Sequence, residues 1–279
     1  MFEEVSTETF QGQTSRHELF GKSWRVANPK AVVCLIHGFG EHLGRYEHVT
    51  RHFNTCGISC YAIDLPGHGK SSGKPGVVQS LQDFILAVDY IYEKAVLENE
   101  GLPVFIYGHS MGGGIVLRYL LLTSLPPAGA LITSPWLDLV KKPNAFEVVI
   151  ARTLLSLGLN KTQKAKLDPN ALSRDTTIGQ NYLNDPLVHS IASIRMYFAL
   201  NDNGVYLMDK KFDFQTPILL AHGTADTITK YRASQILASR HPNQITLKLW
   251  DGLRHETHNE LNKEEVLNFY SNWILNRLK

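Results

Sequence analysis

The chain has 279 residues, of which 43% are hydrophobic and 19% charged, and its formal net charge is +2 at pH 7. This length is enough to bury one large core, and the composition is that of a globular protein rather than a disordered or fibrous one. No block of like charges and no basic stripe with interleaved aromatic residues is visible, so nucleic acid is not an expected partner. No apolar run reaches the ~18 residues that a membrane span requires.

The first residues and the cysteines both favour a cytoplasmic location. Residues 1–8 are acidic and polar, and they lack the basic and apolar regions of a secretory signal. Cys34, Cys56 and Cys60 are odd in number and lie in the first quarter of the chain, which is not the pattern of a disulfide framework. They also lack the additional ligands of a zinc site. We therefore expect free thiols and no metal centre.

Short apolar runs alternate with amphipathic ones in the first half of the chain, which predicts a parallel sheet covered by helices on both faces. An opening pair of strands is expected first, and continuous apolar runs typical of interior parallel strands follow. A later segment has apolar residues spaced for one face of a helix. In chain order, these elements are expected at 7–11, 17–25, 31–37, 58–64 and 82–97.

The most informative segment is a strand, a tight turn and a helix in direct succession. Apolar residues at 104–107 run into Gly-x-Ser-x-Gly at 108–112, and a helix-like run follows at once. This is the context of a nucleophile elbow, in which the serine occupies a strained turn at the end of a strand. Gly108 and Gly112 flank Ser110 because a Cβ atom there would collide with the neighbouring strand and helix. The pattern predicts that Ser110 is a nucleophile.

The alternation of strands and helices is interrupted in the second half of the chain. After a strand expected at 129–133, residues 136–215 are predicted to form helices and loops without clear strands. Helices are expected there near 145–157 and 191–207. The alternation then resumes, with strands expected at 217–223 and 245–250 and helices at 234–239 and 263–278.

This order predicts an α/β core in two parts, residues 1–135 and 216–279, interrupted by a helical insertion at 136–215. The insertion follows a strand, and open parallel sheets bind ligands beyond the carboxyl ends of their strands. We therefore expect the insertion to form a lid over the site. A helical subdomain without a role at the site is the alternative.

A serine hydroxyl is a poor nucleophile at neutral pH, so it needs a base to take its proton and an acid to orient that base. In a sheet of this kind the chain order is serine, acid, histidine. Asp226 follows the strand expected at 217–223, and His255 follows the strand expected at 245–250. Both residues are therefore expected at the same edge of the sheet as Ser110.

Three other residues are alternatives for these roles. His258 is a second candidate for the base, but it lies farther from the strand end and is expected at the start of the closing helix. Asp251 and Asp202 are other candidates for the acid, but Asp251 shares a loop with the base and Asp202 falls in the insertion. We therefore predict Asp226 as the acid and His255 as the base.

Acyl transfer also needs N–H donors for the oxyanion of the tetrahedral intermediate, and losing one donor can cost ~3 kcal/mol. One donor is expected to be the N–H of Met111, directly after the nucleophile. The other is expected to be the N–H of Phe39, in the loop after an early strand. Gly38 and Gly40 would let the backbone of this loop approach the substrate closely.

Several sequence motifs carry a resemblance to a known family. They are His-Gly-Phe-Gly-Glu-His-Leu-Gly-Arg-Tyr at 37–46, Asp-Leu-Pro-Gly-His-Gly-Lys-Ser at 64–71, Gly-His-Ser-Met-Gly-Gly at 108–113, Asn-Asp-Pro-Leu-Val at 184–188, and the segments 223–226 and 252–260. Together they resemble the monoacylglycerol lipase and lysophospholipase group of α/β-hydrolases. The motif at 184–188 lies in the insertion and is not shared by hydrolases at large, so the resemblance extends over nearly the whole chain.

The resemblance implies an α/β-hydrolase fold with a helical cap that admits a single acyl chain. It assigns the nucleophile to Ser110, its partners to Asp226 and His255, and the oxyanion hole to Phe39 and Met111. These are the same five residues that the strand order indicates.

Four polar residues beside these loops are interpreted as structural. His37 precedes the oxyanion loop and His109 precedes the nucleophile, and both are expected to serve as hydrogen-bonding residues. Glu41 and Arg45 match the family motif and are expected to form a structural pair near the oxyanion loop.

The predicted helix at 145–155 is apolar on more than one face. Such a helix is buried, lines a pocket or touches a membrane surface. Burial against the core is the simplest interpretation. An acyl tunnel and transient membrane contact are the alternatives, and the second would make the protein peripheral at membranes.

These features predict a serine hydrolase that cleaves carboxylic esters of single-chain lipids, first of all monoacylglycerol to fatty acid and glycerol, through an acyl-enzyme on Ser110. The chemistry needs neither metal nor organic cofactor. A lysophospholipase or a carboxylesterase for short or medium chains is the main alternative. A peptidase is less favoured because no acidic cluster in the insertion would anchor a free amino terminus. A non-catalytic hydrolase-like ligand-binding protein is a further alternative. The natural substrate and the oligomeric state stay open.

Overall fold

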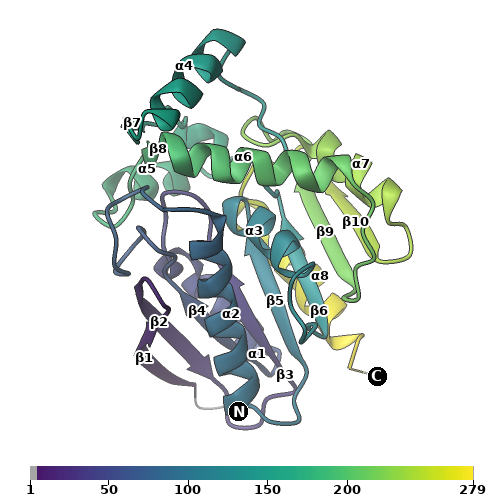
Figure 1. Ribbon diagram of the computed structural model, residues 1–279. Coiled ribbons are helices and arrows are strands. Elements are labelled where there is room, and N and C mark those ends of the chain that lie inside the picture. Colours follow the sequence, from purple (N-terminus) through teal and green to yellow (C-terminus); the bar gives the residue numbers. More distant parts are fainter. Residues whose placement is uncertain (1–4, 279) are drawn as a thin grey trace.

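An eight-stranded sheet crosses the molecule in the order β1-β2-β4-β3-β5-β6-β9-β10 (Figure 1). The computed structural model describes residues 5–278, so residues 1–4 and 279 of the two predicted core segments lie outside the described residues. β2 pairs antiparallel with β1 and with β4, and the other neighbours in the sheet are parallel. The strands are β1 (Ser6–Gln13), β2 (Glu18–Arg25), β3 (Ala31–Ile36), β4 (Ile58–Ile63), β5 (Val104–His109), β6 (Gly129–Thr133), β9 (Ile218–Gly223) and β10 (Ile245–Trp250).

Helices cover both faces of this sheet (Figure 1). One face carries α2 (Leu81–Glu98), α3 (Met111–Tyr119), α6 (Ile194–Asp209) and α7 (Tyr231–Arg240). The other face carries α1 (Glu47–Thr55) and α8 (Lys263–Leu275). The mostly parallel, two-sided architecture predicted from the alternation of strands and helices is therefore present.

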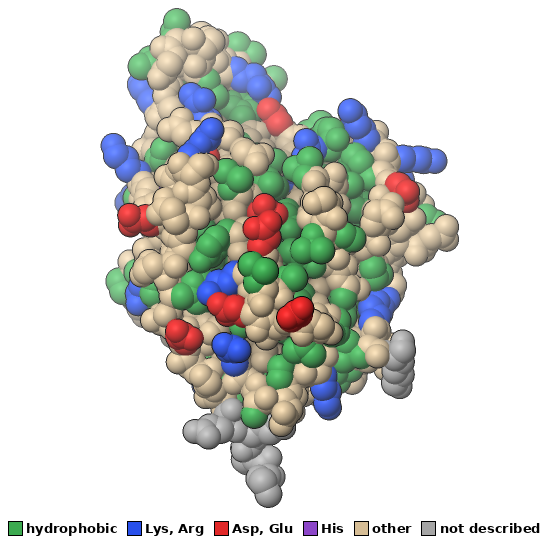
Figure 2. All heavy atoms as spheres, turned by 60° about the horizontal axis from the view of Figure 1, so that its bottom comes forward, with side chains coloured by type: hydrophobic (Ala, Val, Ile, Leu, Met, Phe, Trp, Pro, Cys, Tyr) green, Lys and Arg blue, Asp and Glu red, His purple; other side chains and the backbone are tan. Residues whose placement is uncertain are grey.

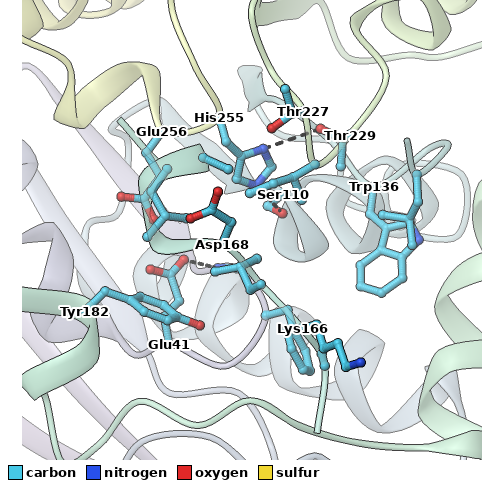
Figure 3. A pocket seen from close by; sticks show the side chains of 18 of the residues that line it. Glu41, Ser110, Trp136, Lys166, Asp168, Tyr182, Thr227, Thr229, His255 and Glu256 are labelled. Atoms are coloured by element: carbon cyan, nitrogen blue, oxygen red, sulfur yellow. Dashed lines mark hydrogen bonds between the residues drawn. The ribbon is translucent and has the colours of Figure 1, made fainter. Parts of the chain in front are cut away.

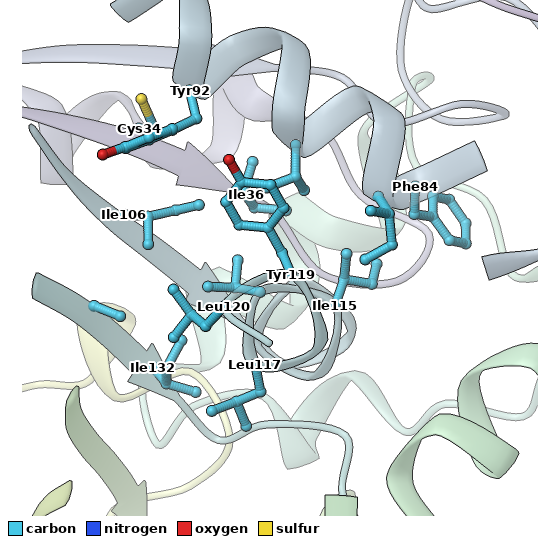
Figure 4. Close-up of a cluster of buried hydrophobic side chains, with 14 of the residues drawn as sticks. Cys34, Ile36, Phe84, Tyr92, Ile106, Ile115, Leu117, Tyr119, Leu120 and Ile132 are labelled. Atoms are coloured by element: carbon cyan, nitrogen blue, oxygen red, sulfur yellow. The ribbon is translucent and has the colours of Figure 1, made fainter. Parts of the chain in front are cut away.

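The interior strands form because their continuous apolar runs are buried on both sides. In β3, Cys34 and Ile36 face α2 and α3, whereas Val33 and Leu35 face α1 and α8. Figure 4 shows the hydrophobic cluster on the face that α2 and α3 cover, where side chains of β3, β5 and β6 pack against those of the two helices. Each large apolar side chain buried in this way contributes about 1.5–3 kcal/mol.

The strand order reverses direction between β3 and β5. From β3 the chain first moves outward to β4 and then returns through α2 to β5 on the other side of β3. The loops that leave the carboxyl ends of β3 and β5 therefore diverge, and they leave a crevice at the edge of the sheet. The loop after β3 contains Phe39, and the loop after β5 contains Ser110.

Residues 136–215 enter after β6 and contain more structure than the sequence predicts. A two-stranded antiparallel sheet joins β7 (Thr162–Lys164) and β8 (Ile191–Ser193), and strands of three residues are too short to show an alternating pattern. The elements of this insertion are α4 (Ala145–Ser156), β7, the 3₁₀ turn η2 (Pro169–Ala171), α5 (Thr176–Asn184), β8 and α6. The helix expected from residue 191 begins at Ile194, because Ser193 caps it by accepting a hydrogen bond from the N–H of Met196.

The interpretation of α4 as a helix buried against the core is wrong. None of its residues is buried, and Phe146 and Val149 are 73% and 62% exposed. The helix projects beyond the end of the sheet at the top of Figure 1, so the sheet offers no surface on which it can pack. Among the described residues, no helix has the length and hydrophobicity needed to cross a membrane.

Charges of both signs are dispersed over the face of the molecule drawn in Figure 2. Lysine and arginine side chains alternate there with aspartate and glutamate side chains, as the small net charge of +2 would suggest. A protein that binds nucleic acid through its phosphates presents a surface dominated by positive charge. The face in Figure 2 is not of that kind.

Candidate active site

Ser110 occupies the sharp turn between β5 and α3. Its backbone has φ 52° and ψ −115°, which for a residue with a side chain costs about 1–3 kcal/mol. The close packing around the turn explains the glycines beside it. A Cβ at Gly112 would lie 2.4 Å from the carbonyl oxygen of Ile36, and one at Gly108 would lie 2.8 Å from the carbonyl oxygen of Gly112. The backbone therefore has the geometry expected of a nucleophile elbow.

The structure brings the three residues of the predicted triad together. The Nε2 atom of His255 lies 2.9 Å from the Oγ atom of Ser110, and its Nδ1 atom lies 2.7 Å from Oδ2 of Asp226. An ionised carboxylate only accepts hydrogen bonds, so the ring proton is on Nδ1 and the lone pair of Nε2 faces the hydroxyl. This arrangement can take a proton from the serine.

The carboxylate of Asp226 is buried but well supplied with donors. Its Oδ1 accepts hydrogen bonds from the N–H groups of Ile228 (2.7 Å) and Thr229 (3.0 Å). Its Oδ2 lies 3.0 Å from Nε2 of His222, besides the contact with His255. Burial raises the pKa of Asp226, but the charge of His255 and the hydrogen bonds with His222 and His255 outweigh burial and hold the pKa well below its ordinary value. The residue is therefore an anion throughout the neutral range.

The pKa of the His255 imidazole shifts in the opposite direction, upward. Burial lowers its pKa, but the charge of Asp226 and the hydrogen bond to it outweigh burial, so the pKa lies above the ordinary 6.5. Its backbone is held by Ser134, whose Oγ donates to the carbonyl oxygen of His255 at 2.7 Å. Ser134 has φ 44°, the second residue with a side chain and a left-handed backbone among those described.

Sequence reasoning missed three residues that support the triad, namely Ser134, Thr229 and His222. Thr229 carries a usable signal, because an aspartate often accepts hydrogen bonds from the N–H groups two and three residues later. Ser134 acts through a contact with His255, 121 residues later in the chain, and His222 contacts Asp226 across the turn that ends β9. No sequence motif marks either contact.

The loop that contains Phe39 is fixed beside the nucleophile. The N–H of Gly38 donates to Oε1 of Glu41 at 2.6 Å, and a Cβ at Gly38 would lie 3.3 Å from Cβ of Ser110. Met111 is the first residue of α3, so its N–H has no acceptor within the helix. Both predicted oxyanion donors therefore belong to backbone next to the serine.

The expected pair of Glu41 and Arg45 is part of a larger buried network. The guanidinium of Arg45 contacts Glu41 and also binds both carboxylate oxygens of Glu256, at 2.8 and 2.9 Å. The hydroxyl of Tyr46 donates to Glu41 at 2.7 Å. Because Glu256 follows His255 directly, Arg45 connects the oxyanion loop with the loop of the base. The sequence did not indicate this role of Glu256.

The alternative triad residues lie elsewhere. His258 belongs to the 3₁₀ turn η3 (Thr257–Asn259), not to the closing helix, and burial lowers its pKa to about 3. Its Nδ1 lies 3.2 Å from the hydroxyl of Tyr107. Asp251 accepts a hydrogen bond from Thr224 on the surface, and Asp202 pairs with Arg152 in the insertion. None of the three contacts Ser110.

His37, before the oxyanion loop, and His109, before the nucleophile, make the structural contacts that the sequence predicts. His37 accepts a hydrogen bond from the N–H of Leu65 at 2.9 Å. The ring of His109 lies 2.9 Å from the Thr133 hydroxyl through Nδ1 and packs against the ring of His255, with 4.9 Å between centroids.

Ser110 and His255 line a cavity of about 400 Å³. Figure 3 shows Trp136 on one side of them and Tyr182 and Glu41 on the other. The insertion supplies much of the wall, including Leu139, Ala165, Leu167, Leu172, Ala192 and Tyr197. No residue of α4 lines this cavity, so α4 does not form an acyl tunnel here. Within residues 5–278 no cluster of His, Cys, Asp or Glu side chains is suited to hold a metal ion.

Comparison with known proteins decides the family. The family model described as serine aminopeptidase, S33, matches residues 27–262. The chain belongs to this family. The monoacylglycerol lipase of Mycolicibacterium smegmatis is 31% identical to it over 253 residues, 90% of each protein. An uncharacterised abhydrolase domain-containing protein of Dictyostelium discoideum is 38% identical over 254 residues, but the chain spans only about a quarter (27%) of that relative's length.

Solved structures agree with this assignment. The crystal structure of the Paleococcus ferrophilus monoacylglycerol lipase is 30% identical to this chain and matches it with a TM-score of 0.82, over 98% of this chain and 99% of that one. The α/β-hydrolase fold, the family resemblance and the class of serine hydrolase that the sequence predicts are confirmed by these matches.

Proposed function

We propose that this protein hydrolyses carboxylic esters of single-chain lipids, with monoacylglycerol as the preferred class of substrate and fatty acid and glycerol as the products. The hydrogen-bonded series of Ser110, His255 and Asp226 carries this proposal. It opens into a cavity of a size that suits one small organic ligand. The lipases to which the chain is similar support the choice of substrate.

In the proposed reaction, Nε2 of His255 takes the proton of Ser110 as Oγ attacks the ester carbonyl carbon. The N–H groups of Phe39 and Met111 donate to the oxyanion that forms. Collapse of this intermediate breaks the ester bond, and His255 returns the proton to the departing alcohol. A water molecule, deprotonated by His255, then attacks the acyl carbon. The bond between this carbon and Oγ breaks, His255 returns the proton to Ser110, and the fatty acid leaves.

The family model carries the description of an aminopeptidase, but the cavity favours an ester. A peptidase that reads a free amino terminus needs a carboxylate available to the ammonium group. Glu41 and Glu256 face the cavity, but Arg45 binds both of them, and the Tyr46 hydroxyl and the Asn259 amide also donate to them. Asp168 also lines the wall, but Lys166 lines the same wall. An ester has no ammonium group, so it needs no free carboxylate in the cavity.

A panel of substrates tests the proposal. The purified protein should hydrolyse monoacylglycerol and p-nitrophenyl esters, and a fluorophosphonate probe should label Ser110. A panel of acyl chain lengths, with lysophosphatidylcholine included, separates a monoacylglycerol lipase from a lysophospholipase and from a short-chain esterase. Cleavage of aminoacyl p-nitroanilides without cleavage of esters would instead support the peptidase. Failure of folded protein to react with the probe would reject the enzyme proposal altogether.

The residues 136–215 are proposed as a lid whose exposed helix touches a lipid surface. The outward side chains of α4 include Phe146, Val149 and Ile150, and Leu157 follows at its end. An exposed apolar helix above a cavity for a lipid ester is well placed to meet a membrane from which the substrate comes.

A further inference from the structure

The motif at 184–188, which lies in the insertion, takes no part in the proposed chemistry. In the structure this motif and the residue after it contact the oxyanion loop, residues 38–42. The Nε2 atom of His42 lies 2.8 Å from Oδ2 of Asp185, and the N–H of His189 donates to the carbonyl oxygen of Gly40 at 2.8 Å. Two hydrogen bonds therefore join the insertion to the oxyanion loop, one at Gly40 and one at His42.

The contact between His42 and Asp185 has a defined direction. Nδ1 of His42 accepts a hydrogen bond from the N–H of Gly44 at 3.2 Å, so in the neutral ring the proton is on Nε2 and is donated to Asp185. The other oxygen of Asp185 accepts from the N–H of Leu187 at 2.9 Å. Burial raises the pKa of Asp185, but the hydrogen bonds from His42 and Leu187 outweigh burial and keep it below its ordinary value.

The backbones of the loop and the insertion are also in close contact. Gly40 has φ 71°, and a Cβ on it would lie 2.1 Å from the carbonyl oxygen of His189. Only a glycine fits there, and the loop cannot shift toward the insertion without displacing residue 189.

Phe39 lies between two anchors. On one side, Glu41 holds the N–H of Gly38 at 2.6 Å, close to Ser110. On the other side, His189 holds Gly40. A donor in an oxyanion hole works only where its N–H is held in a fixed direction, and a small displacement loses most of its effect.

We propose that Asp185 is a positioning residue, which acts through His42 and the backbone of His189 to fix the N–H of Phe39 toward the oxyanion. The inference rests on the proposed function of the site. It assigns to the insertion a part in the chemical step, in addition to any part in binding the acyl chain.

The substitution Asp185→Asn tests this assignment with little change in shape. His42 and Leu187 donate to different oxygens of Asp185, so an asparagine there turns its oxygen to one of these donors and its NH2 group to the other. The matched control is Asp202→Asn. This substitution removes an exposed ion pair in the same insertion, between Asp202 and Arg152, that does not include a residue of the oxyanion loop. The measurements are kcat and KM for p-nitrophenyl acetate and for p-nitrophenyl laurate, together with the unfolding temperature.

We expect Asp185→Asn to lower kcat by about 10- to 100-fold. The factor should be the same for both esters, since a misplaced oxyanion donor affects every acyl group. KM should change less than the turnover number, and Asp202→Asn should match the wild type. His42→Ala should also lower kcat on both esters, and the loss in the double variant should be smaller than the product of the two single losses, because both substitutions weaken the contact between His42 and Asp185.

Loss confined to the laurate ester, or a rise in KM alone, would overturn the proposal, because the segment would then act only on substrate access. Unchanged kcat on both esters would overturn it as well. If the variant is too unstable to purify, Asp185→Glu keeps the charge and should retain more turnover than His42→Ala; equal loss in the two would count against the proposal. A wild-type protein that cleaves neither ester would reject the proposed function itself, which is a separate result.

Discussion

The core and the insertion contribute to the cavity in different ways. The core supplies Ser110, Asp226 and His255, all buried and each held by several hydrogen bonds. The insertion supplies mainly wall, but it is not a detached cover: the N–H of Glu256, next to the base, donates to the carbonyl oxygen of Leu172 at 2.8 Å. The two parts are therefore joined at the site, although the reacting side chains all come from the core.

Within the insertion, α4 and α6 show that an apolar sequence does not by itself determine burial. Both helices are rich in apolar residues, yet α6 buries Met196, Leu200 and Leu207 against the core, and α4 buries nothing. The two helices differ in burial because they lie in different parts of the fold. Helix α6 crosses the end of α3 (Figure 1), whereas α4 lies beyond the sheet.

The largest expected effect on turnover comes from a substitution in the core, at the nucleophile. Ser110→Ala removes the nucleophile and should reduce kcat by about 10⁵- to 10⁶-fold, with the unfolding temperature within a few degrees of the wild type. Steady-state hydrolysis and fluorophosphonate labelling measure the loss. Turnover retained in a preparation free of other esterases would reject Ser110 as the nucleophile.

Asp226→Asn comes next, because it leaves the geometry but removes the charge that orients and supports the base. We expect kcat to fall by about 10⁴-fold. In the wild type, kcat/KM should fall as the pH drops through a midpoint above 6.5, since His255 must be neutral and its pKa is raised. In the variant this midpoint should move to lower pH. A flat wild-type profile between pH 5 and 8 would contradict the role of His255.

A pair of leucine substitutions tests the contrast between α6 and α4 on stability. Leu207→Ala should lower the free energy of unfolding by about 2–5 kcal/mol, because the side chain is fully buried. Leu157→Ala at the end of α4 removes a side chain that is 69% exposed and should change stability by less than about 0.5 kcal/mol. Urea denaturation measures both, and equal losses would show that α4 packs in solution.

The smallest expected effect concerns the proposed membrane contact. Replacing Phe146 and Val149 together with serine should weaken co-sedimentation with phosphatidylcholine vesicles by about 3- to 10-fold. Hydrolysis of dissolved p-nitrophenyl acetate should not change. Leu97→Ser is the control, since this leucine is 80% exposed but belongs to α2. A loss of vesicle binding of the same size in the control would remove α4 as the contact.

Much of the molecule could be predicted from local patterns. Continuous apolar runs marked β3, β4, β5, β6 and β9, because a strand buried on both faces needs apolar residues throughout. The places of Asp226 and His255 after late strands followed from the chain order of this architecture. The helix α1 was not predicted, nor was α5, and both are short helices of nine residues with mixed composition.

The sequence alone thus determined the class of fold, the strand ends and the residues that belong there, because these depend on periodicity and on glycines in tight turns. Tertiary structure decided the rest: that Ser134 holds the backbone of His255, that Arg45 joins Glu41 to Glu256, and that α4 stays exposed. The reason is physical. A hydrogen bond between segments a hundred or more residues apart leaves no periodic trace, and the burial of an apolar helix depends on which surface the fold places beside it.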